Sequence, residues 1–168
     1  MDILKSSIDW TKAEVFSSLF FILFGGMFLS ASLGFWQIGK TELAKAYVIP
    51  TLVAGVLLLI IGLGLSIQHY VRITSFENAY NEDAAAFIAS EVARSEKVLG
   101  DFGLVVFKII PLIIATCAVL FIFFDGPIWR ASFVTTIVMM GLIILVDTNS
   151  SARLSDYKDK VTEAQQAK

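Results

Sequence analysis

The chain has 168 residues, enough for about one domain, and its 57% hydrophobic content exceeds the roughly 45–50% of soluble domains. The net charge of −2 offers no basic surface of the kind that nucleic-acid binding needs, so we expect no nucleic-acid partner. Cys117 is the single cysteine, which excludes an intramolecular disulfide and a cysteine-based metal cluster. The composition indicates a protein whose partner is the lipid bilayer.

The first 14 residues form a polar lead, which we treat as a segment of its own (1–14). Thr11 and Glu14 have the spacing of a capping box, in which each side chain bonds the other residue's backbone amide. Trp10 and Val15 occupy the positions of the accompanying hydrophobic staple. The pattern predicts that a helix begins at Thr11.

The first apolar run, Val15–Ile38, contains 24 residues and no charged side chain. At about 1.5 Å per residue it reaches about 36 Å, enough to cross a hydrocarbon core of about 30 Å. Gly26, Ser30 and Gly34 recur every four residues, so they share one stripe of the helix, where a second helix can approach closely. We expect this stripe to pack within the chain; self-association between protomers is the alternative.

A second apolar run, Tyr47–Ile67, completes the first membrane hairpin (residues 15–71). Gly62 and Ser66 form another pair of small residues at four-residue spacing, which favours helix packing. His69 is the only histidine and follows this run. Without a second histidine, a polar cap at the membrane boundary is the better interpretation than a metal or catalytic site.

The polar segment 72–101 holds nine of the 28 charged side chains and joins the two halves of the chain. Its apolar residues fall on one side at 100° per residue, which predicts an amphipathic helix from Glu82 to Val98 with Asn81 as its N-cap. Glu91 and Arg94 interrupt the apolar side, and their i,i+3 spacing allows them to pair. The segment carries a net charge of −3. We expect it to cover protein, because helices on anionic lipid have basic polar faces.

The second membrane hairpin (residues 102–147) contains two more apolar runs, Leu104–Phe124 and Ala131–Val146. The turn sequence Asp125–Pro127 between them makes the two spans neighbours. Pro111 lies within the third span and is expected to kink it.

The tail (residues 148–168) is polar, with large apolar side chains at the 3-4 spacing of a heptad seam. This seam is too short to be stable alone, so we expect the tail helix to dock on the central helix. The residues predicted to meet are Leu154, Tyr157 and Val161 from the tail and Phe87, Ile88 and Val92 from the central helix. The alternative is a disordered tail, with the central apolar stripe serving as a partner's docking site.

The distribution of lysine and arginine predicts the orientation. Four spans place the lead, the central segment and the tail on one side, with ten of these residues against three on the other. Positive residues favour the cytoplasm, so both termini are expected inside, in a bacterial inner membrane.

No phosphate-binding loop, hydrolase, metalloprotease or C-x-x-C motif occurs in the sequence. No acidic or basic residue lies in the middle third of any span, where ion-coupled carriers usually need one. We therefore predict an all-α membrane protein with four spans and a cytoplasmic amphipathic helix between the second and third. Our functional hypothesis is a non-enzymatic accessory, scaffold or assembly subunit of a larger membrane complex, without a cofactor or a metal. A homo-oligomeric channel or carrier for ions or small solutes is the alternative.

Overall fold

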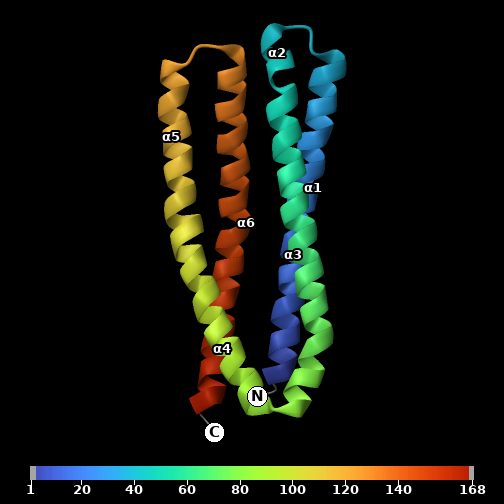
Figure 1. Cartoon of the computed structure of the whole chain (residues 1–168), viewed down its shortest axis with the longest axis vertical. Helices are drawn as coiled ribbons and strands as arrows, with labels where there is room; N and C mark the ends of the chain where they lie inside the picture. Colours follow the sequence, from blue (N-terminus) through green and yellow to red (C-terminus); the bar gives the residue numbers. More distant parts are fainter. Residues whose placement is uncertain (1–2, 167–168) are drawn as a thin grey trace.

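The computed structural model describes residues 3–166, and every regular element among them is a helix. Their order along the chain is α1 (Ile3–Ile38), α2 (Glu42–Ala46), α3 (Val48–Glu82), α4 (Ala84–Asp101), the π-helix η1 (Phe102–Ile109), α5 (Ile110–Phe123) and α6 (Pro127–Gln166). Figure 1 shows two hairpins side by side, α1 with α3 and α5 with α6, with both termini at one end.

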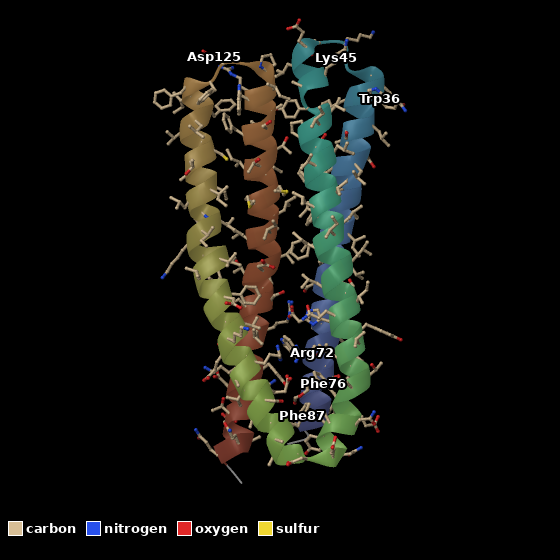
Figure 2. The ribbon with its side chains drawn as sticks, viewed as in Figure 1. Trp36, Lys45, Arg72, Phe76, Phe87 and Asp125 are labelled. Carbon is tan, nitrogen blue, oxygen red and sulfur yellow. The ribbon has the colours of Figure 1, made fainter. Side chains whose placement is uncertain are left out.

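Four helical stretches are long and apolar enough to cross a membrane: α1, α2 with α3, α4 through α5, and α6. This confirms the prediction of an all-α chain with four candidate spans. The 36 residues of α1 reach about 54 Å at 1.5 Å per residue, well beyond a hydrocarbon core of about 30 Å. At the end that holds the termini, the long helices form a bundle that contains Arg72, Phe76 and Phe87 (Figure 2).

The charged segment 72–101 is built differently from the expectation. The structure does not show a separate amphipathic helix there, because α3 continues to Glu82 and α4 leads directly into η1 and α5. The chain reverses at Asp83, whose carboxylate accepts hydrogen bonds from the amides of Ala85 and Ala86 at 2.8 and 2.9 Å. Asp83 rather than Asn81 is the N-cap, so that detail of the prediction is wrong.

The predicted capping box at Thr11 is also wrong, because α1 already begins at Ile3. Thr11 lies inside the helix and donates its hydroxyl hydrogen to the carbonyl of Ser7 at 2.8 Å. Ile3 and Trp10 are buried against the other helices. Tertiary packing of the first two turns thus overrides the local start signal, since most helix stability comes from such packing.

The third long helix changes its winding just before Pro111. Residues Phe102–Ile109 form a π-helix, and the amide of Ile110 donates to the carbonyl of Val105, five residues back. Pro111 has no amide to bond the carbonyl of Phe107, so the wider turn and the proline disturb the same part of the helix. The kink expected at Pro111 stays a prediction, and the structure shows a π-helix that ends two residues before it.

Within the first hairpin, glycines bring α1 and α3 into close contact. A Cβ added at Gly62 would lie 2.9 Å from the amide nitrogen of Ile22 and 3.0 Å from Cβ of Phe21. One turn away, the hydroxyls of Ser18 and Ser66 lie 2.6 Å apart. Gly62 and Ser66 therefore both lie at the α1–α3 contact, as the small-residue spacing predicts.

The stripe of Gly26, Ser30 and Gly34 does not take part in this contact. A Cβ added at either glycine would meet nothing within 4 Å, and exposed Ser30 donates only to the carbonyl of Gly26 at 2.9 Å. Gly25, about 100° away around the helix, faces α3 instead, and its added Cβ would lie 3.0 Å from the carbonyl oxygen of Gly55. The expectation that the stripe packs within the chain is wrong for the described residues; self-association stays a prediction.

A buried cluster at the end with the termini, which we call the base, draws on α1, α3, α4 and α6. Its core consists of Ile3, Trp10, Phe76, Phe87, Ile88, Leu154, Tyr157 and Val161, with Val92 packed against it. The six residues predicted to meet between the tail and the central segment thus lie in or against one cluster. Each large apolar side chain buried here contributes roughly 1.5–3 kcal/mol.

Candidate functional site

Glu91 of α4 is the centre of a buried polar network in the base. Its carboxylate accepts hydrogen bonds from Arg72 of α3 at 2.7 Å, from Arg94 at 2.7 Å and from the hydroxyl of Tyr157 of α6 at 2.9 Å. Only 6% of the Glu91 side chain is exposed. The predicted Glu91–Arg94 pair is confirmed, and one carboxylate links three helices.

The electrostatics of this network keep Glu91 ionised. Burial alone would raise the pKa of Glu91, but the hydrogen bonds and charge of Arg94, the charge of Arg72 and the hydrogen bond from Tyr157 outweigh burial and lower the pKa. Burial and the charge of Arg94 lower the pKa of Arg72, against the opposing effect of Glu91. Burial and the charge of Glu91 raise the pKa of Tyr157, so its phenol stays neutral.

A second ion pair joins the two ends of the chain. Arg153 of α6 donates to the carboxylate of Glu14 of α1 at 2.9 Å, to the hydroxyl of Ser17 at 2.6 Å and to that of Ser150 at 3.1 Å. The sequence analysis missed this pair because it assigned Glu14 to a local cap. The signal that could have predicted the pair is that the lead and the tail carry opposite net charges and were expected on the same side of the membrane.

Aromatic rings support the network at its α1 side. The indole of Trp10 stacks on the ring of Tyr157, with centroids 5.0 Å apart, and the guanidinium of Arg94 lies 4.6 Å from the Trp10 ring. Such cation–π contacts are worth about 0.5–2 kcal/mol. Trp10 is therefore a structural member of the base.

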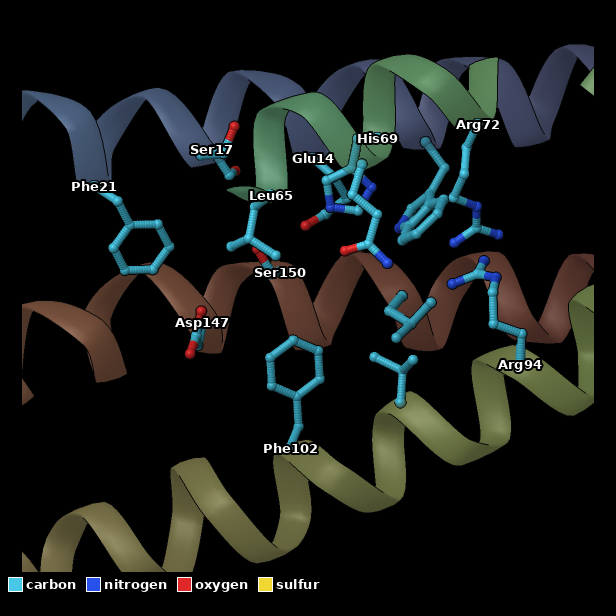
Figure 3. Close-up of a pocket in the computed structure, with 15 residues that line it drawn as sticks. Glu14, Ser17, Phe21, Leu65, His69, Arg72, Arg94, Phe102, Asp147 and Ser150 are labelled. Carbon is cyan, nitrogen blue, oxygen red and sulfur yellow. The ribbon is translucent and has the colours of Figure 1, made fainter. Parts of the chain in front are cut away.

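A cavity of about 300 Å³, which we call the base cavity, lies between the two hairpins next to this network (Figure 3). Arg72 and Arg94 reach into it from opposite helices, and Phe21, Leu65 and Phe102 form apolar walls. The remaining polar side chains at its lining are Glu14, Ser17, Ser18, Gln68, His69, Asp147 and Ser150. Apolar walls with a few charged groups are typical of ligand sites of this size.

His69 lines this cavity, with its ring edge-on to Trp10 at a centroid distance of 6.0 Å. It follows the second apolar run and lies beside Arg72 in the lining (Figure 3). Its Nδ1 and the Nε1 of Trp10 are enclosed and have no hydrogen-bond partner among residues 3–166. An unsatisfied buried group of this kind costs about 1–3 kcal/mol.

A second cavity, which we call the outer groove, lies between α3 and α6 nearer the opposite end of the molecule. It measures about 460 Å³, and small or hydroxyl-bearing side chains contribute to its lining: Ala54, Ser132, Thr135 and Thr136. The hydroxyl of Thr135 is buried and has no hydrogen-bond partner within the described part of the chain. Neither hairpin fills this space between them.

Within residues 3–166, no group of three or more histidine, cysteine, aspartate or glutamate side chains is placed to hold a metal ion. The sequence-predicted interaction residues divide into three sets. Gly62 and Ser66 lie at the α1–α3 contact, the six tail and central residues lie at the base, and Gly26, Ser30 and Gly34 lie on an open face of α1.

Comparison of the sequence with protein-family models and with curated proteins, and of the fold with solved structures, finds no match. The class of the protein therefore rests on its helices. Four long apolar helices indicate an integral membrane protein of the all-α class.

Proposed function

We propose that this protein is a non-enzymatic accessory or scaffold subunit of a larger membrane complex, and that the outer groove receives a transmembrane helix of its partner. The observation that carries the proposal is the unfilled space between α3 and α6. The hydroxyl of Thr135 at its wall has no hydrogen-bond partner among residues 3–166. A helix that enters this space would join the two hairpins at the end opposite the base.

The lining of the outer groove favours a helix over an acyl chain. Ala54 and Ser132 let a helix backbone approach closely, and Ser132 and Thr136 have the four-residue spacing of small contact positions. A partner side chain or backbone carbonyl can also bond the Thr135 hydroxyl, whereas an acyl chain offers no hydrogen bond. The partner chemistry is thus an apolar helix with small residues and at least one exposed acceptor.

Site-specific crosslinking in the native membrane tests this proposal. We expect a photo-crosslinker at Thr136 to capture one polytopic membrane protein, because Thr136 lines the outer groove. The same group at Val138, which is 48% exposed and absent from that lining, should capture lipid only. Ser132→Leu, which fills the groove, should abolish both the Thr136 crosslink and co-purification of that protein in mild detergent. Equal capture from both positions, or a wild-type protein that purifies alone, would overturn the proposal.

A homo-oligomeric channel or carrier is the second candidate. The open face of α1 with Gly26, Ser30 and Gly34 supports it, because small residues unused within the chain leave room for a second copy. Ion or solute flux through liposomes that contain only the purified protein would favour this candidate over the accessory role.

We further propose that both termini lie in the cytoplasm of a bacterial inner membrane. The ten lysine and arginine residues on the side of the termini, against three on the other, support this orientation. Reporter fusions after Lys45 and near Gly126 should report the outer side, and a fusion near Ala89 the inner side. An inner-side signal from the Lys45 fusion would contradict the four-span topology.

A further inference from the structure

The base cavity carries an inference that is independent of the proposed partner helix. We propose that it binds a membrane lipid whose oxyanion head, a phosphate or a carboxylate, carries a net negative charge, and that the head lies against Arg72 and Arg94. The acyl chain would lie along Phe21, Leu65 and Phe102 toward the membrane.

The charge balance at the arginine end favours an anion. Two guanidinium groups share the single carboxylate of Glu91, which leaves one positive charge without a counter-charge there. The hydrogen bond from Arg72 to Glu91 uses one of the five N–H donors of its guanidinium, and about 20% of the Arg72 side chain remains exposed. Spare guanidinium donors beside an excess positive charge are what phosphate and carboxylate groups bind.

The other acidic groups at the lining set the orientation of a bound lipid in the cavity. Glu14 is neutralised by Arg153 at 2.9 Å. Asp147 has no ion-pair partner among the described residues and lies seven residues before Leu154 on α6, about 10 Å along the helix. An anionic head is therefore repelled at the Asp147 end and attracted at the arginine end.

The shape of the base cavity fits a chain rather than a compact solute. Its lining on α1 runs from Trp10 to Phe21, which is 11 residues or about 16 Å along the axis. The aromatic and leucine walls lie at the end nearer the apolar runs, as Figure 3 shows for Phe21, Leu65 and Phe102. Basic pockets between membrane helices on one side of a bilayer commonly hold lipid head groups.

Trp10 supplies the probe for a test, because it lines the base cavity. A chain with Trp36→Phe and Trp129→Phe retains Trp10 as its only tryptophan. This protein is placed in phosphatidylcholine vesicles with rising fractions of a lipid that carries bromine on the first carbons of its acyl chain, next to the head. Bromine quenches tryptophan fluorescence on contact, and Trp10 lies beside Arg94 at the head end of the cavity. The lipids are phosphatidylglycerol, a free fatty acid, and diacylglycerol as a control with the same chains and no oxyanion.

We expect saturable quenching by phosphatidylglycerol or by the fatty acid at a mole fraction at least fivefold below that for diacylglycerol. The lipid that saturates first identifies the head as phosphate or carboxylate. Quenching by diacylglycerol at the same mole fraction would overturn the proposal, since the walls alone would then account for binding. An absence of quenching by all three lipids would show that the cavity binds no lipid, and this result would also overturn the proposal.

Variants separate charge from folding. Arg72→Gln removes the uncompensated charge, while Arg94 and Tyr157 still bond Glu91. In this variant the quenching curve of the anionic lipid should therefore coincide with that of diacylglycerol. Arg72→Lys keeps the charge and should retain most of the preference. Arg130→Gln, in an exposed pair with Asp125 at the other end, should change nothing. Thermal melting reports whether each variant folds, and an Arg72→Gln protein with wild-type lipid preference would contradict the proposal.

Discussion

Replacing Glu91 with glutamine should lower the free energy of unfolding by about 3 kcal/mol. The change leaves Arg72 and Arg94 without their counter-charge and weakens the bond from Tyr157. Removing one partner of a buried ion pair typically costs about 3–5 kcal/mol. The two arginine side chains are 20% and 21% exposed, so solvent keeps the cost at the lower end of that range.

Thermal or denaturant unfolding in a mild detergent, followed by circular dichroism, measures this effect. Glu96→Gln is the matched control, because Glu96 pairs with Lys158 at 3.3 Å on an exposed surface and should cost no more than about 1 kcal/mol. The folded-state pKa of Glu91 is lowered, so its stabilisation is present above the unfolded-state pKa of about 4.5 and is lost as pH falls through the folded value. Equal losses in the two variants would show that Glu91 is not the centre of the base.

Gly62→Leu should be the second most damaging change, with a cost of at least about 1–3 kcal/mol from overpacking. A side chain there would collide with the backbone nitrogen of Ile22, at 2.9 Å from the added Cβ, and backbone cannot move aside cheaply. The first hairpin would have to separate along α1 and α3. The unfolding measurement used for Glu91 applies here as well.

Gly26→Leu and Gly34→Leu are the controls, because an added Cβ at either position meets nothing within 4 Å. Both should leave the stability of the isolated chain within about 0.5 kcal/mol of wild type. A loss at Gly34 only in samples that also change oligomeric state would indicate a contact between copies. A loss as large as that of Gly62→Leu in the isolated chain would contradict the described α1–α3 contact.

The spans could be predicted because uninterrupted apolar runs of this length have few alternatives in a chain this hydrophobic. The contact between the tail and the central segment could also be predicted. Each segment has a short apolar stripe, the two segments carry opposite net charges, and both were expected on the same side of the membrane. The ends of the helices could not be predicted from the sequence. The sequence predicts the lead and segment 72–101 as separate elements, because their polar residues hide the continuation of α1 and α3 past the apolar runs.

The candidate site was less predictable for a different reason. A helix repeats every 3.6 residues, so Gly25 and Gly26 point about 100° apart, and only the partner helix decides which of them is used. The Glu14–Arg153 pair joins residues 139 apart in the sequence, and no local pattern marks it. The base cavity likewise arises from side chains of several helices, none of which forms a recognisable motif.

The network at the base has a consequence for biosynthesis. The hydroxyls of Ser7 and Tyr157 lie 2.7 Å apart, although the two residues are separated by 150 positions in the sequence. Glu14 and Arg153, which form an ion pair, are separated by 139 positions. A nascent chain can therefore insert all four spans and still expose Trp10, Glu14 and the Glu91 network until the segment with Arg153 and Tyr157 leaves the ribosome. Chains that terminate early keep unpaired charges and an open aromatic cluster on the side of the termini. Such a surface distinguishes a chain that lacks the segment with Arg153 and Tyr157 from one that contains it.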